Sequence, residues 1–249
     1  MTSPLSADQP IPTVGHHLIV PDWPAQAESG VVHLGREASK HLAQVLRSRA
    51  GQPISLTDGC GHIAQTRVQS LSNMHVHVVV EQTWTQTRWP WLLSLVQAIP
   101  KGKKLDEVIR RACELGVDQF YPILTDRCDR KLDANKAQML VTRWQAIANS
   151  ATEQSRRAWM MTVSPIGSIP TDMPGIVLWE EATTPLSVVL DSHDVGDLVF
   201  LIGPEGGLTA QEVEMSNMTP ARLGPQILRT ETAGVTAAAL GAWHLGRLG

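Results

Sequence analysis

Short apolar runs follow one another in the first third of the chain, from His16 to about Gln82. The runs are HHLIV, VVHL, PISLTDG, HIAQTRVQSL and MHVHVVVEQ, and Gly, Asp and Asn turn signals separate them. One helix is predicted among them over residues 36–47, where apolar side chains recur at helical spacing. This pattern predicts a small β-barrel over residues 16–82.

Two segments beside this barrel lack a clear apolar period. Residues 1–15 combine Pro4, Pro10 and Pro12 with small polar residues, which predicts a disordered arm. Residues 83–91, TWTQTRWPW, contain a proline and few aliphatic side chains, which favours a linker. A second domain is therefore expected over residues 92–249.

The pattern in the second domain changes to apolar strands that alternate with helices. Strands are predicted at LLSLVQAI, QFYPIL, GIVLWE and DLVFLI, and helices at GKKLDEVIRRACELG, which stops at Gly116, and over residues 135–153. Such alternation predicts an α/β fold with a mostly parallel sheet that is covered on both faces. Ligands of these sheets lie beyond the carboxyl ends of the strands, so we expect a site where DLVFLI ends.

Composition narrows the classes of protein. No apolar run approaches the roughly 20 residues of a membrane span, and no signal peptide is recognisable, which favours a cytoplasmic protein without a membrane partner. Three separate cysteines form no metal-binding pair, so no metal is expected. Because the net charge is −3, a polyanionic partner would have to bind local basic clusters, one of which contains Arg127, Arg130 and Lys131.

The strand DLVFLI runs directly into GPEGG, residues 203–207. Thr209 and Glu212 then form the pattern of a capping box that opens a helix. Glycines allow a sharp bend and a close approach to a ligand, although a purely structural turn would use the same residues. The bend lacks a lysine and contains Pro204 and Glu205, which is unlike a phosphate-binding loop. A carboxylate beside open backbone groups is compatible with S-adenosylmethionine.

A second glycine-containing segment, LGPQILRTETA, occupies residues 223–233. The alanine-rich run that follows favours a helix, which Thr232 is expected to cap. If the residues before that helix are extended, Arg229 and Glu231 point the same way. They would then form an ion pair or face one site together.

These two segments resemble the C-terminal motifs of the ribosomal RNA small subunit methyltransferase E family, uridine-N3 methyltransferases of the SPOUT superfamily. HLAQVLR, KGKKLDEVIRRACELGV, DRCDRKLD and RWQAIANSATEQSRR are similar to further family segments in the same order. The resemblance covers nearly the whole chain from residue 16. It implies S-adenosylmethionine-dependent methylation of uridine N3 in 16S ribosomal RNA, within the free RNA or the 30S subunit.

The resemblance also implies a fold and a set of site residues. The fold is a PUA-like RNA-binding barrel followed by a SPOUT domain with a C-terminal trefoil knot, and the protein acts as a homodimer. The residues implied to bind the cofactor are Leu178, Glu180, Leu201, Ile202, Gly203, Glu205, Gly206, Gly207, Leu223, Gly224, Ile227, Leu228 and Thr232.

Methylation of uridine N3 requires removal of a weakly acidic proton and stabilisation of the resulting anion. We assign the stabilising cation to Arg229 and the base to Glu231, with Glu205 as the second candidate. The residues expected to contact RNA are His41, Arg47, Lys101, Lys104, Arg111 and Arg157.

The chain departs from the family pattern at three places. His16 and His17 stand where the family typically opens its first strand with an arginine. The family often has an arginine at the position of Gln226 and a glycine at that of Arg156, and the latter change can add a phosphate contact. Two alternatives therefore stay open. One is a SPOUT methyltransferase that acts on another base or on a ribose 2′-hydroxyl. The other is a ribosome-associated RNA-binding protein without catalysis.

Overall fold

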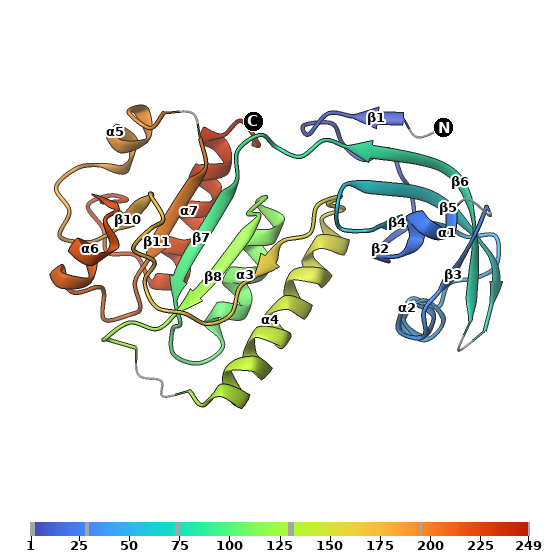
Figure 1. Ribbon diagram of the computed structural model, residues 1–249, viewed down its shortest axis with the longest axis horizontal. Coiled ribbons are helices and arrows are strands. Elements are labelled where there is room, and N and C mark those ends of the chain that lie inside the picture. The colour runs from blue at the N-terminus through green and yellow to red at the C-terminus, as the bar shows by residue number, and fades with distance from the viewer. Residues whose placement is uncertain (1–2, 28–29, 73–74, 129–131, 195, 249) are drawn as a thin grey trace. The chain divides into compact units, whose positions relative to one another are not determined.

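The chain folds into two compact units, which are shown in a computed structural model (Figure 1). The structure describes residues 3–27, 30–72, 75–128, 132–194 and 196–248. The N-terminal unit contains residues 1–89 together with residues 152–160, and the C-terminal unit contains residues 90–151 and 161–249.

Six strands form the sheet of the N-terminal unit. They are β1 (Ser3–Leu5), β2 (His16–Ile19), β3 (Val31–Leu34), β4 (Pro53–Thr57), β5 (His62–Leu71) and β6 (Val76–Gln86). The order is β1-β6-β5-β4-β2, and β3 pairs with β6. The antiparallel pairs alternate buried apolar and exposed polar side chains, as expected of strands with one covered face.

Short helices accompany this sheet: α1 (Trp23–Gln26), α2 (Arg36–Lys40) and the π-helix η2 (His41–Val45). The predicted helix over residues 36–47 is thus present but changes to π-helical hydrogen bonding at His41 and ends at Val45. Its Leu42 is fully buried and packs into the core of the unit with Leu18, Ile54 and Val78.

The expected disordered arm differs from the structure. Residues 3–5 form β1, a parallel edge strand beside β6, with Ser3 opposite Trp84. The side-chain amide of Gln86 donates to the carbonyl of Gln9 at 2.8 Å, and Val14 N–H donates to the side chain of Gln65 at 2.8 Å. Long-range hydrogen bonds therefore hold a segment whose local sequence contains little apolar surface.

The expected linker over residues 83–91 also differs, because β6 continues through Gln86. A later segment, residues 152–160, completes the N-terminal unit. The Glu153 carboxylate accepts from Ile19 N–H at 3.0 Å, and the Ala158 carbonyl accepts from the Thr57 hydroxyl at 3.0 Å. The chain thus enters this unit twice.

Strands and helices alternate in the C-terminal unit. The elements are β7 (Leu93–Ala98), α3 (Lys104–Glu114), β8 (Gln119–Ile123), α4 (Ala134–Gln154, whose last residues lie in the N-terminal unit), β9 (Thr162–Val163), β10 (Ile176–Leu178), α5 (Leu186–Asp191), β11 (Leu198–Ile202), α6 (Ala210–Ser216), β12 (Thr219–Ala221) and α7 (Thr230–His244). The sheet has the order β12-β10-β11-β7-β8-β9, and all its pairs are parallel. The predicted parallel α/β sheet is confirmed.

Both faces of this sheet are buried. Leu93 and Leu95 of β7 lie in a core with α3, α4, α5 and α7, whereas Val96 and Ala98 of the same strand face a smaller core that includes Val213 of α6. Glycine brings α7 close to the sheet, since a Cβ on Gly241 would lie 2.7 Å from side chains of Leu93 and Phe200. Within the described ranges, no helix combines the length and apolar character needed to cross a membrane.

The start of α7 corrects one expectation. The helix begins at Thr230 with Arg229 as its N-cap, so Thr232 lies inside the first turn and does not cap it. Arg229 keeps an extended backbone, with φ −64° and ψ 149°, whereas Glu231 is already helical. The two side chains are therefore not presented by one extended segment. Of the two alternatives, an ion pair between them does not occur among the described residues, where Glu231 pairs with Lys104 instead.

Candidate functional site

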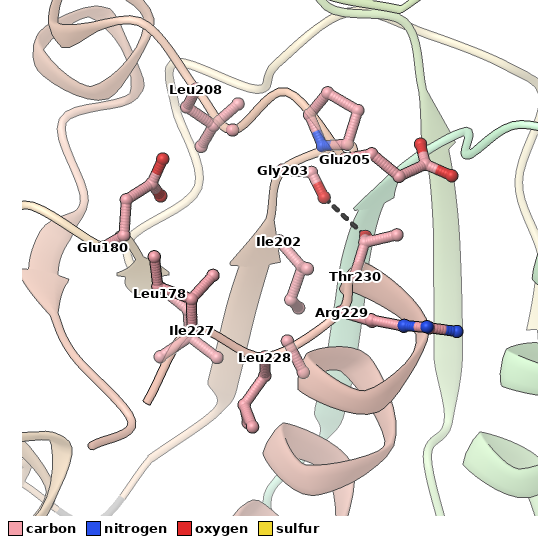
Figure 2. A pocket seen from close by; sticks show the side chains of 13 residues that line it. Leu178, Glu180, Ile202, Gly203, Glu205, Leu208, Ile227, Leu228, Arg229 and Thr230 are labelled. Carbon is pink, nitrogen blue, oxygen red and sulfur yellow. Dashed lines mark hydrogen bonds between the residues drawn. The ribbon is translucent and has the colours of Figure 1, made fainter. Parts of the chain in front are cut away.

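A cavity of about 270 Å³ lies where the carboxyl ends of β10 and β11 meet the start of α7 (Figure 2). Its lining residues are Leu178, Glu180, Ile202, Gly203, Pro204, Glu205, Gly207, Leu208, Ile227, Leu228, Arg229, Thr230 and Ala233. A smaller cavity of about 120 Å³ adjoins it and adds Leu223 and Gly224. The two glycine-containing segments thus converge at the edge of the sheet where a ligand was expected.

Close packing explains the glycines of the bend over residues 203–207. Gly207 has a φ of +71°, and a Cβ there would lie 2.2 Å from a carboxylate oxygen of Glu180. The helix α6 then begins with the predicted capping box, in which Thr209 accepts from Glu212 N–H at 3.2 Å and Glu212 accepts from Thr209 N–H at 2.8 Å. The bend is therefore fixed at both ends.

A chain of buried hydrogen bonds joins the two walls of the cavity. The Thr230 hydroxyl donates to the Gly203 carbonyl at 2.6 Å, which Figure 2 marks. The side-chain amide of Gln97 in β7 donates to the Thr230 carbonyl at 3.0 Å. The Gln97 side chain fits only because residue 234 is glycine, since a Cβ there would lie 2.2 Å from the Gln97 amide oxygen. The spacing between the walls is thus set by specific contacts.

Charged groups gather at one edge of the cavity. The Lys104 ammonium lies 2.8 Å from a Glu205 carboxylate oxygen and 3.5 Å from Glu231 Oε2. Partial burial works to raise the pKa of Glu205, but hydrogen bonds from the Lys104 ammonium and from Lys101 N–H hold that pKa below its ordinary value. The hydrogen bond to Glu205 raises the pKa of Lys104. Both groups are therefore charged near neutral pH.

Arg229 lies at the same edge but makes no such pair. Its guanidinium has no hydrogen bond to another residue in the described part of the chain, although its carbonyl accepts from Ala233 N–H at 2.8 Å. In Figure 2 the Arg229 and Glu205 side chains extend toward one side, away from Leu178 and Glu180. The cavity thus has an aliphatic part and a charged edge.

Ten of the thirteen predicted cofactor residues line one of these cavities. The exceptions are Leu201, Gly206 and Thr232, which line neither. Side chains alternate along β11, so Leu201 faces the opposite core while Ile202 faces the cavity. Gly206 lies against Arg127 instead, and Thr232 is exposed on α7. Of the two predicted catalytic residues, Arg229 lines the cavity and Glu231 lies beside it, near Lys104.

Sequence reasoning missed several residues of the site. Leu208, Thr230 and Ala233 line the cavity, and Gln97 supports it from beneath. Gln97 is fully buried in a strand whose other residues are apolar except for Ser94. A lone amide within the run LLSLVQAI was the signal that could have found it, because buried polar groups require partners.

The predicted RNA contacts are distributed over both units. In the C-terminal unit Lys101 and Arg111 are exposed, Arg111 pairs with Glu107 at 2.7 Å, and Lys104 is engaged by the two carboxylates. In the N-terminal unit His41 is half-buried in η2, Arg47 is exposed after that helix, and Arg157 is half-buried. Two members of the basic cluster, Arg130 and Lys131, lie outside the described residues.

Two of the family departures, at His17 and Arg156, have structural roles in the N-terminal unit. Burial lowers the pKa of His17 to about 4, and its ring contacts the Ser55 hydroxyl and the Arg157 carbonyl. The Arg156 guanidinium donates to the Thr13 carbonyl at 3.0 Å and also to that of Gly15. Two nitrogens of the Arg156 guanidinium are thus already engaged by carbonyls of the protein, and a phosphate contact would have to use its remaining N–H donors.

Comparison with known proteins shows to which class of protein the chain belongs. The RNA methyltransferase domain model matches residues 87–242, and the RNA methyltransferase PUA domain model matches residues 34–81. The structure is also similar to that of a ribosomal RNA small subunit methyltransferase E from Neisseria gonorrhoeae bound to S-adenosylmethionine. That similarity has a TM-score of 0.78 with 28% identity and covers 97% of each chain. These matches define an RNA methyltransferase domain preceded by a PUA-type domain.

Two sequence relatives narrow the class to one family. A ribosomal RNA small subunit methyltransferase E from Mycobacterium bovis is 32% identical over 216 residues, which cover 81% of each chain. One from Bacillus subtilis is 33% identical over 81% of this chain and 85% of its own. The chain belongs to the ribosomal RNA small subunit methyltransferase E family.

Proposed function

We propose that this protein transfers the methyl group of S-adenosylmethionine to N3 of a uridine in 16S ribosomal RNA. The observation that carries the proposal is the cavity in which residues 203–205, 207 and 208 face residues 227–230. Family membership supports the methyltransferase class, and the relative from Neisseria gonorrhoeae has S-adenosylmethionine bound. The choice of uridine N3 follows from the resemblance of LRTETA to uridine-specific members.

The residues of the cavity fit the proposed cofactor. Aliphatic side chains of Leu178, Ile202 and Ile227 offer apolar surface for a heterocycle, while the Glu180 and Glu205 carboxylates can accept hydrogen bonds from hydroxyl and amino groups. Bound there, S-adenosylmethionine supplies a methyl group on a positively charged sulfur. Within the described ranges no cluster of three potential metal ligands occurs, and the proposed reaction requires none.

Three side chains at the charged edge supply the remaining chemistry. We assign Arg229 to stabilise the anion that forms on the uridine ring, because a guanidinium offers a planar set of N–H donors and this one has no partner among the described residues. We assign Glu231 as the base that takes the N3 proton, because its buried Oε2 accepts no hydrogen bond from a described residue and lies 3.5 Å from the Lys104 ammonium. Glu205 is the weaker candidate base, since Lys104 and Lys101 N–H already hold its carboxylate.

The proposed substrate requires contacts outside the cavity. We assign phosphate contacts to Lys101 and Arg111 in the C-terminal unit, and to His41, Arg47 and Arg157 in the N-terminal unit. Lys104 is reassigned to the catalytic edge. The proposed place of action is the cytoplasm, where free 16S ribosomal RNA or the 30S subunit would be the partner.

We further propose the homodimer and the trefoil knot that the resemblance implies. An apolar cavity of about 430 Å³ between α5 and α7 shares Leu223 and Pro225 with the smaller of the two cofactor cavities, and Trp243 in its lining is 64% exposed. Burial of this surface by a second copy would complete the site from outside. Light scattering tests the dimer, with Trp243→Asp expected to yield a monomer. Tracing residues 176–230 in an experimental density map tests the knot.

Two experiments test the activity. Calorimetric titration with S-adenosylmethionine is expected to show stoichiometric binding. Absence of binding at millimolar cofactor would refute the proposed methyltransferase activity. Deletion of the gene in its host should abolish 3-methyluridine in 16S ribosomal RNA, as measured by mass spectrometry of nucleosides. Loss of a different methylated nucleoside would instead support one of the alternative targets.

A further inference from the structure

A second cavity of about 340 Å³ adjoins the bend at residues 203–207. Its walls are the loops after three neighbouring strands: Ile99, Pro100 and Lys101 after β7, Arg127 and Cys128 after β8, and Gly206 after β11. Pro204 and Glu205 line both this cavity and the one assigned to the cofactor. A ligand in the second cavity would therefore lie next to the charged edge of the first.

Hydrogen bonds between the loops shape this cavity in advance. Arg127 donates to the Gly206 carbonyl at 2.7 Å, and Lys101 N–H donates to the Glu205 carboxylate at 3.1 Å. Behind them, Asp126 N–H donates to the Glu212 carboxylate at 2.8 Å, which ties the loop after β8 to the start of α6. Since binding sites for small groups are mostly formed before the ligand arrives, this network favours a site over a surface irregularity.

The chemistry of the cavity suits one nucleotide of an RNA chain. Arg127 is exposed, and only one of its guanidinium nitrogens bonds to a described residue, so N–H donors remain for a phosphate oxygen. Ile99, Pro100 and Pro204 contribute apolar surface against which a base can lie. Glu205, the carboxylate in the lining, is neutralised by Lys104 at 2.8 Å. A nucleotide meets positive charge and apolar surface here.

We propose that this cavity binds the target nucleotide, with the Arg127 guanidinium on a phosphate beside the uridine to be methylated. The inference rests on the proposed function and extends it to the position of the substrate. A uridine within a folded RNA must leave its stack to react, and a cation on its phosphate would hold the extruded form. The base would then lie against Pro204, next to the cofactor cavity.

Arg127→Ala tests the proposal in steady-state methylation of 16S ribosomal RNA from cells that lack the gene. The KM for RNA is expected to rise about tenfold, as for a lost charged hydrogen bond, while the calorimetric Kd for S-adenosylmethionine stays within about twofold. The slope of log K for RNA against log salt should fall by about one, the signature of one phosphate contact. Arg127→Lys should restore part of the KM.

Two further variants make the result specific. Arg110→Ala removes an exposed cation of α3 that is paired with Glu107 and is not assigned to the site, so its KM for RNA should match that of the wild type. Gly206→Ala keeps the charge but places a methyl group 3.3 Å from Cβ and 3.4 Å from Cδ of Arg127, which must shift its side chain. This variant should raise the KM in the same direction but less.

Three outcomes separate this inference from the proposed function. A wild-type protein without methyl transfer would refute the function itself. An active wild type whose KM for RNA is unchanged by Arg127→Ala would refute only the nucleotide site. If Arg127→Ala instead weakens binding of S-adenosylmethionine tenfold, the guanidinium serves the carboxylate of the cofactor and the proposal is overturned.

Discussion

Two arginines, Arg156 in the N-terminal unit and Arg229 in the C-terminal unit, differ in the hydrogen bonds that their guanidinium groups make. Arg156 donates to the carbonyls of Thr13 and Gly15 and so ties the N-terminal segment to residues 152–160. The Arg229 guanidinium bonds to no other described residue and lies at the edge of a cavity. In the sequence, both were candidates to meet an anion.

The comparison teaches that the function of an arginine depends on its remaining donors. A guanidinium bonded to main-chain carbonyls stabilises the fold, whereas one held at a cavity edge without a partner has its donors available for a ligand. The following predictions test whether the two roles can be separated, from the largest expected effect to the smallest.

Arg229→Ala should have the largest effect. Loss of a cation that acts only on the charge formed during the reaction is expected to lower kcat by about 10²- to 10³-fold, with little change in the Kd for S-adenosylmethionine. Single-turnover methylation and calorimetry measure the two quantities. Equal losses in both would assign Arg229 to cofactor binding and remove the contrast with Arg156.

The buried His17 should make the stability of the N-terminal unit depend on pH. Its pKa in the folded protein is about 4, below the ordinary 6.5, because burial disfavours the charged ring. The unfolded chain therefore binds a proton between pH 6.5 and 4 that the folded protein does not. The free energy of unfolding should fall by up to about 3 kcal/mol as pH decreases through this window.

Urea denaturation at pH 4 to 8 measures this dependence. In His17→Gln the group that titrates is absent, so the difference between the wild-type and variant curves isolates its contribution. Parallel curves would show that His17 titrates alike in the folded and unfolded states, contrary to the prediction.

Thr230→Val tests the connection between the two walls of the cavity. It removes the hydroxyl that donates to Gly203 and leaves a buried carbonyl without that donor, so kcat/KM should fall by about tenfold. Thr230→Ser keeps the hydroxyl and should retain most activity. If both variants lose activity equally, the methyl group of Thr230 matters and the hydrogen bond does not.

Arg156→Ala should have the smallest effect, and it should affect stability and not activity. Loss of its bonds to Thr13 and Gly15 should lower the free energy of unfolding by about 1 kcal/mol, since the side chain is only partly buried. The Kd for S-adenosylmethionine should not change. A variant with normal stability but a raised KM for RNA would return Arg156 to the role of a phosphate ligand.

Periodicity was sufficient to predict most strands and helices of both units, because their apolar positions repeat at the spacing of the element that buries them. It could not predict β1, since Ser3–Leu5 is held by pairing with β6 more than 80 residues away along the chain. The start of α7 was misplaced by three residues, with the cap at Thr232 instead of Arg229, because Thr232 is a good capping residue by type, whereas contacts of Thr230 with Gly203 and Gln97 set the boundary.

The site was predicted in outline from its two glycine-containing segments. What the sequence could not supply was which neighbour each side chain meets. Lys104 belongs to a helix whose other basic residues are exposed, yet tertiary packing places its ammonium between Glu205 and Glu231. Leu201 and Ile202 are equally apolar, and only the direction of β11 decides which of them faces the cavity.

The double entry of the chain into the N-terminal unit has a consequence for synthesis on the ribosome. Residues 152–160 supply acceptors for Ile19 N–H and for the Thr57 hydroxyl, so this unit is incomplete when residue 89 emerges. It can close only after the nascent chain has extended beyond residue 160. The first unit to start folding must therefore wait for part of the second to be translated, and a gene fragment cut at residue 90 would encode an unfinished unit.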